Sequence, residues 1–271
     1  MTLRVDRVGI TTVQDLGRRG WAHVGVPRSG AADRTSHKLA NRLVGNPPGA
    51  ASIETSGGLV LTALDDCVVV VAGAECEASV DGRAVAHCRS TRVPSGATLR
   101  MNRLVSGVRA YLAVAGGIRG EALLGSLSHD TLSGIVPLPL AIGTTLVVGS
   151  PTGTPTGLDV PITPRDDRVL RVDPVPHLDA RSVQIPVVVS STADRIGVRL
   201  RGYPASHAAG GELASVPLVR GAIQLTPENE LVVMLADHPT TGGYPVIGVM
   251  QPDDVDLLAQ IPSGSGVVLV R

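Results

Sequence analysis

The chain has 271 residues and no net formal charge, because 24 basic residues balance 24 acidic ones. A neutral chain has no broad positive field for a polyanion, which argues against a nucleic-acid partner. No segment reaches the roughly 20 apolar residues that a membrane-spanning helix needs, and the first residues lack the apolar run of a signal peptide. We therefore expect a cytoplasmic protein that binds neither membrane nor nucleic acid.

The residue types favour a mainly β protein. Hydrophobic residues make up 43% of the chain, but there is no Phe, one Trp and three Tyr, so Val, Leu, Ile and Ala must form the core. With 32 Gly and 20 Pro, this mixture is typical of short strands joined by turns. The strongest hairpin signal is Asp81-Gly82, which separates the strand candidates 75–80 and 84–86.

Lysine and cysteine restrict the chemistry of the chain. Lys38 is the only lysine and follows His37, so the sequence has neither a Walker A loop nor a biotin-attachment lysine motif. We expect no biotin on this chain, and any ATP on a partner subunit. Cys67, Cys76 and Cys88 form no C-x-x-C pair, so no metal is predicted, and Cys67 is expected to be a small core residue.

Taken in order, short strands are expected before residue 11, and a helix is predicted at about 31–45. Apolar and basic residues recur there at helical spacing on opposite faces. Ser29 or Asp33 is expected to cap its first turn, and Gly45 to end it before Pro47-Pro48.

The domain boundary is predicted from composition. Residues 151–167 are rich in Pro, Gly and Thr and have no helical or strand period, so they predict a linker. It would join an N-terminal β-rich unit, 1–150, to a C-terminal β unit, 168–271, with a short helix near 253–260.

Two stretches are unusually rich in polar donors. The loop before the first helix carries His23 and Ser29, and free N–H groups before a helix suit an anion. The second stretch, LADHPTTGGYPVIGV at 235–249, offers Thr hydroxyls and Gly amides to a carboxylate, phosphate or ureido oxygen. Asp237 could accept a proton there. The alternative is that Asp237 and Thr240 only satisfy turn amides.

Several runs of sequence carry a family resemblance. They are VQDLGR (13–18), HVGVP (23–27), SGAAD (29–33), ANRLVGNP (40–47), RAYLAVAGGI (109–118), ADRIGVRL (193–200), GAIQ (221–224) and LADHPTTGGY (235–244). Together they resemble the allophanate hydrolase subunit 2 family. That family includes the biotin-dependent carboxyltransferase half-domain of urea amidolyase, one of the subunits of bacterial 5-oxoprolinase and the Kip-type kinase-inhibitor antagonist.

The resemblance implies a mainly β fold of two cyclophilin-like β-barrel units, with one main helix and one short helix. It implies catalytic roles for His23, Asp33 and Asp237. It also implies substrate contacts from Ser29, Asn41, Arg195, Gln224, Thr240, Thr241, Gly242, Gly243 and Tyr244. Arg195 is the preferred clamp, since a guanidinium can hold a carboxylate through two hydrogen bonds.

The same resemblance implies a heteromer that is inactive without its sister subunit, which would be allophanate hydrolase subunit 1 or Kip-type inhibitor-like, with a lactam-utilisation protein as a further partner. The first hypothesis is an ATP-dependent amidohydrolase that opens 5-oxoproline to glutamate. Its variant is carboxyl transfer from carboxybiotin to an amide-like acceptor such as urea. The alternative is a regulatory module that binds its sister protein without chemistry of its own.

Overall fold

The computed structural model describes residues 1–156, 168–175, 184–204 and 213–271. The chain divides into two compact units built from interleaved segments. The first unit comprises Met1–Arg18, Asp33–His129 and Ile135–Thr163, and the second comprises Arg19–Ala32, Asp130–Gly134 and Pro164–Arg271. Two short segments of the N-terminal half therefore belong to the C-terminal unit. The predicted linker is described as far as residue 156, and 157–167 lie outside the described residues.

Two antiparallel sheets form the first unit. The seven-stranded sheet contains, in spatial order, β11 (Ile118–Arg119), β12 (Thr145–Val148), β1 (Thr2–Arg7), β4 (Leu59–Ala63), β9 (Thr98–Leu104), β6 (Cys76–Val80) and β7 (Arg83–Ala84). The five-stranded sheet contains β2 (Thr11–Gln14), β3 (Ser52–Thr55), β10 (Ala110–Val114), β5 (Cys67–Gly73) and β8 (Thr91–Val93). Side chains from both sheets, among them Val5, Leu61, Ile53 and Leu112, form one buried core.

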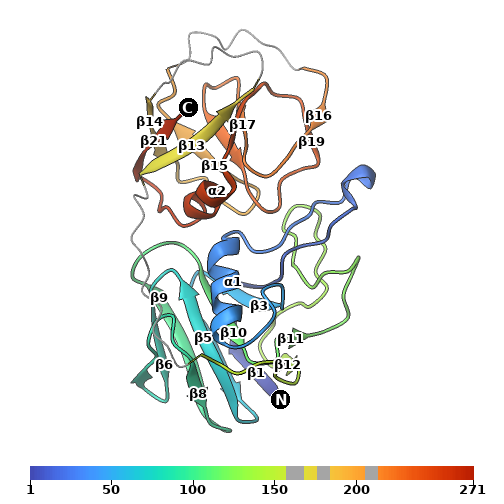
Figure 1. Ribbon diagram of the computed structural model, residues 1–271, viewed down its shortest axis with the longest axis vertical. Coiled ribbons are helices and arrows are strands. Elements are labelled where there is room, and N and C mark those ends of the chain that lie inside the picture. The colour runs from blue at the N-terminus through green and yellow to red at the C-terminus, as the bar shows by residue number, and fades with distance from the viewer. Residues whose placement is uncertain (157–167, 176–183, 205–212) are drawn as a thin grey trace. The chain divides into compact units, whose positions relative to one another are not determined.

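Helix α1 (Arg34–Leu43) packs against β5 and β10 of the five-stranded sheet (Figure 1). Asp33 is its N-cap, and its carboxylate accepts a hydrogen bond from the Ser36 amide at 2.9 Å, which confirms one of the two predicted caps. Gly45 follows the helix at φ 80°, the left-handed conformation that glycine adopts without strain. The buried residues of the helix are not all apolar, because His37 and Asn41 lie among them.

The second unit is a closed barrel of seven strands. In spatial order these are β13 (Val169–Pro174), β20 (Val246–Met250), β17 (Ala222–Leu225), β18 (Leu231–Met234), β15 (Gly197–Arg201), β14 (Gln184–Val189) and β21 (Gly266–Val270). Burial alternates along β13 and β14, as the period-two pattern of a strand with one buried face requires. Val255 and Leu258 of α2 (Pro252–Leu258) complete the barrel core, to which Ala32 also contributes.

The mainly β prediction with two helices is confirmed. Among the described residues, the only helix besides α1 and α2 is a short 3-10 helix, η1 (Ala22–Val24). The second unit also has a two-stranded sheet of β16 (Val216–Pro217) and β19 (Thr241–Gly242). The barrel closes in the second unit, whereas the first unit has two separate sheets. The predicted hairpin forms at β6 and β7, where Val80 pairs with Arg83 across Asp81-Gly82. Cys67 is buried, as expected of a small core residue.

Candidate functional site

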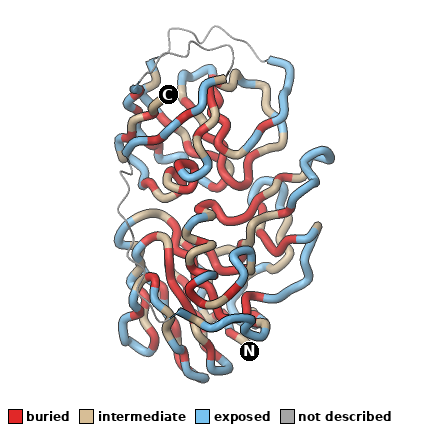
Figure 2. The backbone as a smooth tube through the Cα atoms, viewed as in Figure 1, coloured by how far each residue is buried: buried red, intermediate tan, exposed pale blue. Residues whose placement is uncertain are grey.

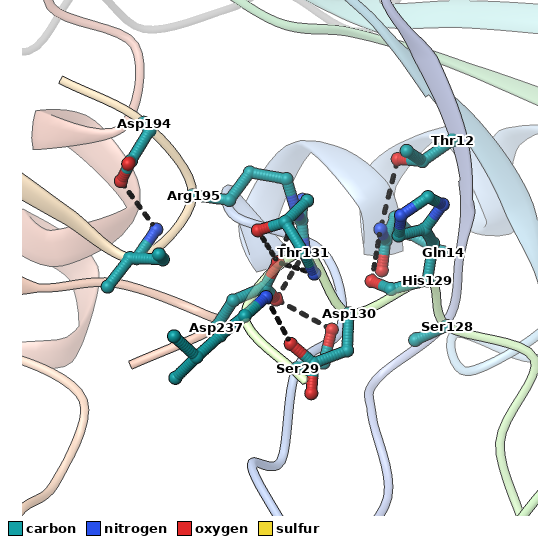
Figure 3. A network of polar contacts seen from close by, with 12 residues as sticks. Thr12, Gln14, Ser29, Ser128, His129, Asp130, Thr131, Asp194, Arg195 and Asp237 are labelled. Carbon is teal, nitrogen blue, oxygen red and sulfur yellow. Dashed lines mark hydrogen bonds and ion pairs between the residues drawn. The ribbon is translucent and has the colours of Figure 1, made fainter. Parts of the chain in front are cut away.

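Asp237 joins three separate segments of the second unit. Its carboxylate accepts hydrogen bonds from Ser29 Oγ at 2.6 Å, from the Thr131 amide at 3.0 Å and from Thr131 Oγ1 at 2.8 Å. Arg195 binds it through Nε at 2.9 Å and Nη2 at 3.0 Å. Figure 3 shows Ser29, Thr131 and Arg195 around this carboxylate. Five hydrogen bonds from three residues leave little capacity on its two oxygens for another donor.

The local backbone explains why these side chains converge. Asp237 lies just beyond β18, and its amide donates to the Arg195 carbonyl at 2.9 Å. The Asp194 carboxylate accepts hydrogen bonds from the amides of Ile196 and Gly197 at 2.7 and 2.9 Å, and this turn orients Arg195. Ser29 has φ 56°, which is uncommon for a residue with a side chain, and its hydroxyl donates a hydrogen bond to the Asp237 carboxylate.

Charge and burial act in opposite directions on Asp237. Burial raises the pKa of this carboxyl, but the charge and hydrogen bonds of Arg195, the Ser29 hydroxyl and the Thr131 amide outweigh it and hold the pKa below its usual range. Arg195 also donates from Nη2 to the Gly30 carbonyl at 2.6 Å. Asp237 and Arg195 therefore form a buried ion pair that holds residues 29–30 and 131 in place, and we call this pair with Ser29 and Thr131 the clamp. This geometry argues for positioning and against proton transfer by Asp237.

The Thr240–Tyr244 turn forms a second polar feature of this unit. Gln224 of β17 donates from Nε2 to the Tyr244 carbonyl at 3.2 Å and holds the turn in place. A Cβ on Gly242 would lie 2.6 Å from that Nε2 atom, so a larger residue there would displace the Gln224 amide. The main chain of the turn pairs with β16, where Val216 lies opposite Gly242. Thr241 and Tyr244 are exposed and can reach a small molecule.

The structure brings only part of the predicted site residues together. Ser29, Arg195 and Asp237 form the clamp, and Gln224 contacts the turn that contains Thr240, Thr241, Gly242, Gly243 and Tyr244. His23 lies in η1, is exposed, and its Nδ1 is 2.9 Å from the Gly20 carbonyl.

Two predicted site residues belong to the first unit, where their contacts serve the fold. Asp33 caps α1. Asn41 is fully buried; its Nδ2 donates to the Ala50 carbonyl at 2.9 Å and its Oδ1 accepts from Asn46 at 3.0 Å. These bonds tie the end of α1 to the chain that follows it, so we infer a structural role for both residues.

Sequence reasoning missed Thr131 as a member of the clamp. Thr131 is 106 residues from Asp237 in the sequence. The neighbouring His129 is held within the first unit, where its amide donates to the Val13 carbonyl at 3.1 Å and its carbonyl accepts from Gln14 at 3.0 Å (Figure 3). The one signal in the sequence was the concentration of polar residues at 126–131.

Neither a metal cluster nor a membrane helix is found in the described part of the chain. No three His, Cys, Asp or Glu side chains gather there in a metal-binding arrangement. No helix among the described residues is long and apolar enough to cross a membrane.

Comparison with known sequences gives a family match and named relatives. Residues 24–271 match the family described as "Carboxyltransferase domain, subdomain A and B". The chain is 34% identical to a 5-oxoprolinase subunit of Escherichia coli (strain K12), over 99% of this chain and 91% of that protein. It is 31% identical to the 5-oxoprolinase subunit of the same name from Haemophilus influenzae, over 94% of this chain and 86% of that protein. It is 29% identical to urea amidolyase of Saccharomyces cerevisiae, over 96% of this chain but 16% of that protein.

Solved structures share the fold over nearly the whole chain. The crystal structure of TTHA0988 has a TM-score of 0.88 and 36% identity, and the match covers 99% of this chain and 55% of that one. The Kluyveromyces lactis urea carboxylase has a TM-score of 0.87 and 25% identity, with 99% of this chain and 27% of that one covered. The chain thus spans about half of the first structure and about a quarter of the second.

Proposed function

The chain belongs to the family of carboxyltransferase domains with subdomains A and B, and within that family we propose that it is a subunit of an ATP-dependent 5-oxoprolinase. In this proposal it acts with a sister subunit to open 5-oxoproline to glutamate. The supporting observation is the match to the Escherichia coli 5-oxoprolinase subunit, which extends over 99% of this chain and 91% of the relative. The match to urea amidolyase takes up only 16% of that much longer protein.

The polar turn of the second unit suits a small cyclic amide. Opening a lactam breaks its C–N bond, with water supplying the hydroxyl to the carbonyl carbon and a proton to the nitrogen. Thr240, Thr241 and Tyr244 offer hydroxyls to the lactam oxygen and the substrate carboxylate, while Gln224 holds their turn in place. In this proposal the Asp237 clamp positions Ser29 and Thr131 and takes no proton itself.

We assign ATP to a partner subunit. The chain has a single lysine, Lys38, which lies half-buried on α1 and not in a glycine-rich phosphate loop. The residues present therefore do not fit the usual phosphate-binding arrangement. A lactam-utilisation protein is the partner of choice for that role.

Carboxyl transfer is the second candidate, favoured by the family description and by the urea amidolyase relatives. The same hydroxyl and amide donors would then hold a ureido oxygen. Avidin separates the two functions, because it captures biotin: carboxyl transfer from a biotinylated partner would stop on adding avidin, and ATP-dependent lactam opening would continue.

Deletion of the gene in its native host tests the proposal. We expect the deletion strain to accumulate 5-oxoproline and to lose growth on it as a nitrogen source, and a plasmid copy to restore both. Normal use of 5-oxoproline with loss of growth on urea would overturn the proposal in favour of carboxyl transfer. Normal growth on both would favour the regulatory module.

A further inference from the structure

Residues 19–32 of the second unit form a loop with a fixed base and an exposed tip. At the base, Ser29 and Gly30 are bonded to Asp237 and Arg195, and Ala32 lies in the barrel core. At the tip, which we define as Gly20–Gly25, every residue is exposed. Figure 2 colours the tip as exposed and the base as buried.

The tip is ordered although it has no core of its own. Its main chain closes on itself through Val24 N to Trp21 O at 3.1 Å and Gly25 N to Ala22 O at 3.0 Å, and none of the residues of η1 is buried. Gly20 and Gly25 have φ of 90° and 80° and open space where a Cβ would be. These main-chain contacts shape the tip, and its apolar side chains remain partly exposed.

Two of those side chains form a small apolar surface. Trp21 and Val24 are three residues apart, and in a 3-10 turn residues at that spacing lie on the same side. They are 37% and 59% exposed. Trp21 is the only tryptophan of the chain, and tryptophan is among the residue types most enriched at the energetic centres of protein interfaces.

The surroundings of this surface are basic. Residues 16–32 contain no Asp or Glu, whereas Arg19 is exposed and Arg28 lies half-buried at the base of the loop. The pKa of Arg28 is lowered first by its burial and then by the charges of Arg19 and Arg220, so the three guanidinium groups lie near one another. Arg220 is paired with Asp256 at 2.7 Å, whereas Arg19 is exposed. A surface of this kind is complementary to an apolar pocket with an acidic rim.

We propose that the tip, Gly20–Gly25, is a docking element for the sister subunit, which receives Trp21 and Val24 in an apolar pocket bordered by acidic side chains. The proposal rests on the proposed function for the identity of the partner. The hydrogen-bonded base supports it, because Ser29 and Gly30 fix the point from which the loop extends, which reduces the entropy that the loop loses on binding. The proposal also places the docking element on the same segment, residues 19–32, as Ser29.

The single tryptophan supplies a direct probe. The full-length chain labelled with 5-fluorotryptophan has one fluorine resonance, and unlabelled sister subunit is silent. On titration with the sister subunit, we expect this resonance to shift and broaden as the complex forms, with complex formation followed independently by gel filtration. A complex that forms and opens 5-oxoproline while the resonance stays unchanged would overturn the docking proposal and leave the proposed function intact.

Affinity measurements on variants complete the test. Trp21→Ala should raise the Kd for the sister subunit at least about tenfold, and Arg19→Gln should slow association and reduce its dependence on salt. Ile142→Ala, at an exposed apolar residue of the first unit, and Arg83→Gln, at an exposed arginine, are the matched controls and should leave the Kd within about twofold. Equal effects of Trp21→Ala and Ile142→Ala would contradict the proposal. Failure of the wild-type chain to bind any sister subunit would overturn the proposed function as well.

Discussion

Asp237 is predicted from its sequence context to accept a proton, but in the structure its carboxylate holds neighbouring side chains in position. Its carboxylate is fully buried and accepts five hydrogen bonds, two of them from Arg195. A general base needs an oxygen that can reach a substrate proton. Proton acceptance by Asp237 stays a prediction from the sequence, and the contacts favour the alternative that Asp237 satisfies the groups around it.

We predict that Asp237→Asn lowers stability. The amide would turn two protons toward existing donors and leave Arg195 without a charged partner, a change that costs about 3 kcal/mol or more for a buried pair. Urea unfolding monitored by circular dichroism measures this difference. Glu228→Gln, an exposed charge removal in the same unit, is the control and should be neutral. Lost activity in the assembled complex with unchanged stability would instead make Asp237 a chemical participant.

His37 predicts a pH dependence of folding. Burial lowers the pKa of this imidazole to about 4, against an ordinary value near 6.5. Between these values the unfolded chain binds a proton that the folded chain does not, so stability falls as the pH falls from 6.5 toward 4. The full effect is on the order of 3 kcal/mol. His37→Gln should flatten the stability profile between pH 7 and 5, whereas the same change at exposed His23 should not. Parallel profiles for His37→Gln and the wild type would refute this account.

At the scale of elements, local sequence patterns were sufficient to predict turns and helix ends, because residues close together in the chain form these structures. The Asp81-Gly82 turn and the Gly45 helix exit follow from conformations that Gly and Asp adopt readily, with φ of 47°, 80° and 80°. Asp33 was correctly identified as a cap, and its catalytic assignment came from family resemblance alone. The buried His37 and Asn41 could not be foreseen, because their partners Ser52 and Asn46 meet them only in the folded chain.

Gly116 offers a test of close packing at the end of β10. It has φ 97°, and an added Cβ would lie 2.0 Å from the Gly149 carbonyl oxygen, a main-chain atom that cannot move independently. Gly116→Ala should therefore cost more than about 1 kcal/mol. Gly125→Ala shares the positive φ but has nothing within 4 Å, so it isolates the conformational strain. Chemical denaturation of both variants measures the difference, and equal losses would show that packing at Gly116 is unimportant.

At the scale of the whole molecule, the family and the mainly β class could be predicted, but the membership of each unit could not. Composition marks a break near 151–167, yet residues 19–32 and 130–134 also belong to the second unit. One contact that places residues 19–32 in the second unit is the hydrogen bond from Ser29 to Asp237, 208 residues apart in the sequence. Neither the residue types nor their spacing predicts this contact. Long-range pairing of this kind is decided by the complete fold.

The most direct test of the proposed function is reconstitution from purified components. The chain, its sister subunit and the lactam-utilisation protein are combined with 5-oxoproline and ATP, and glutamate is measured as each component is omitted in turn. We predict glutamate formation that requires both ATP and this chain, is absent with the chain alone, and is unaffected by avidin. Undiminished glutamate formation without the chain, or a complete mixture that leaves 5-oxoproline intact while transferring carboxyl groups to urea in an avidin-sensitive reaction, would contradict it.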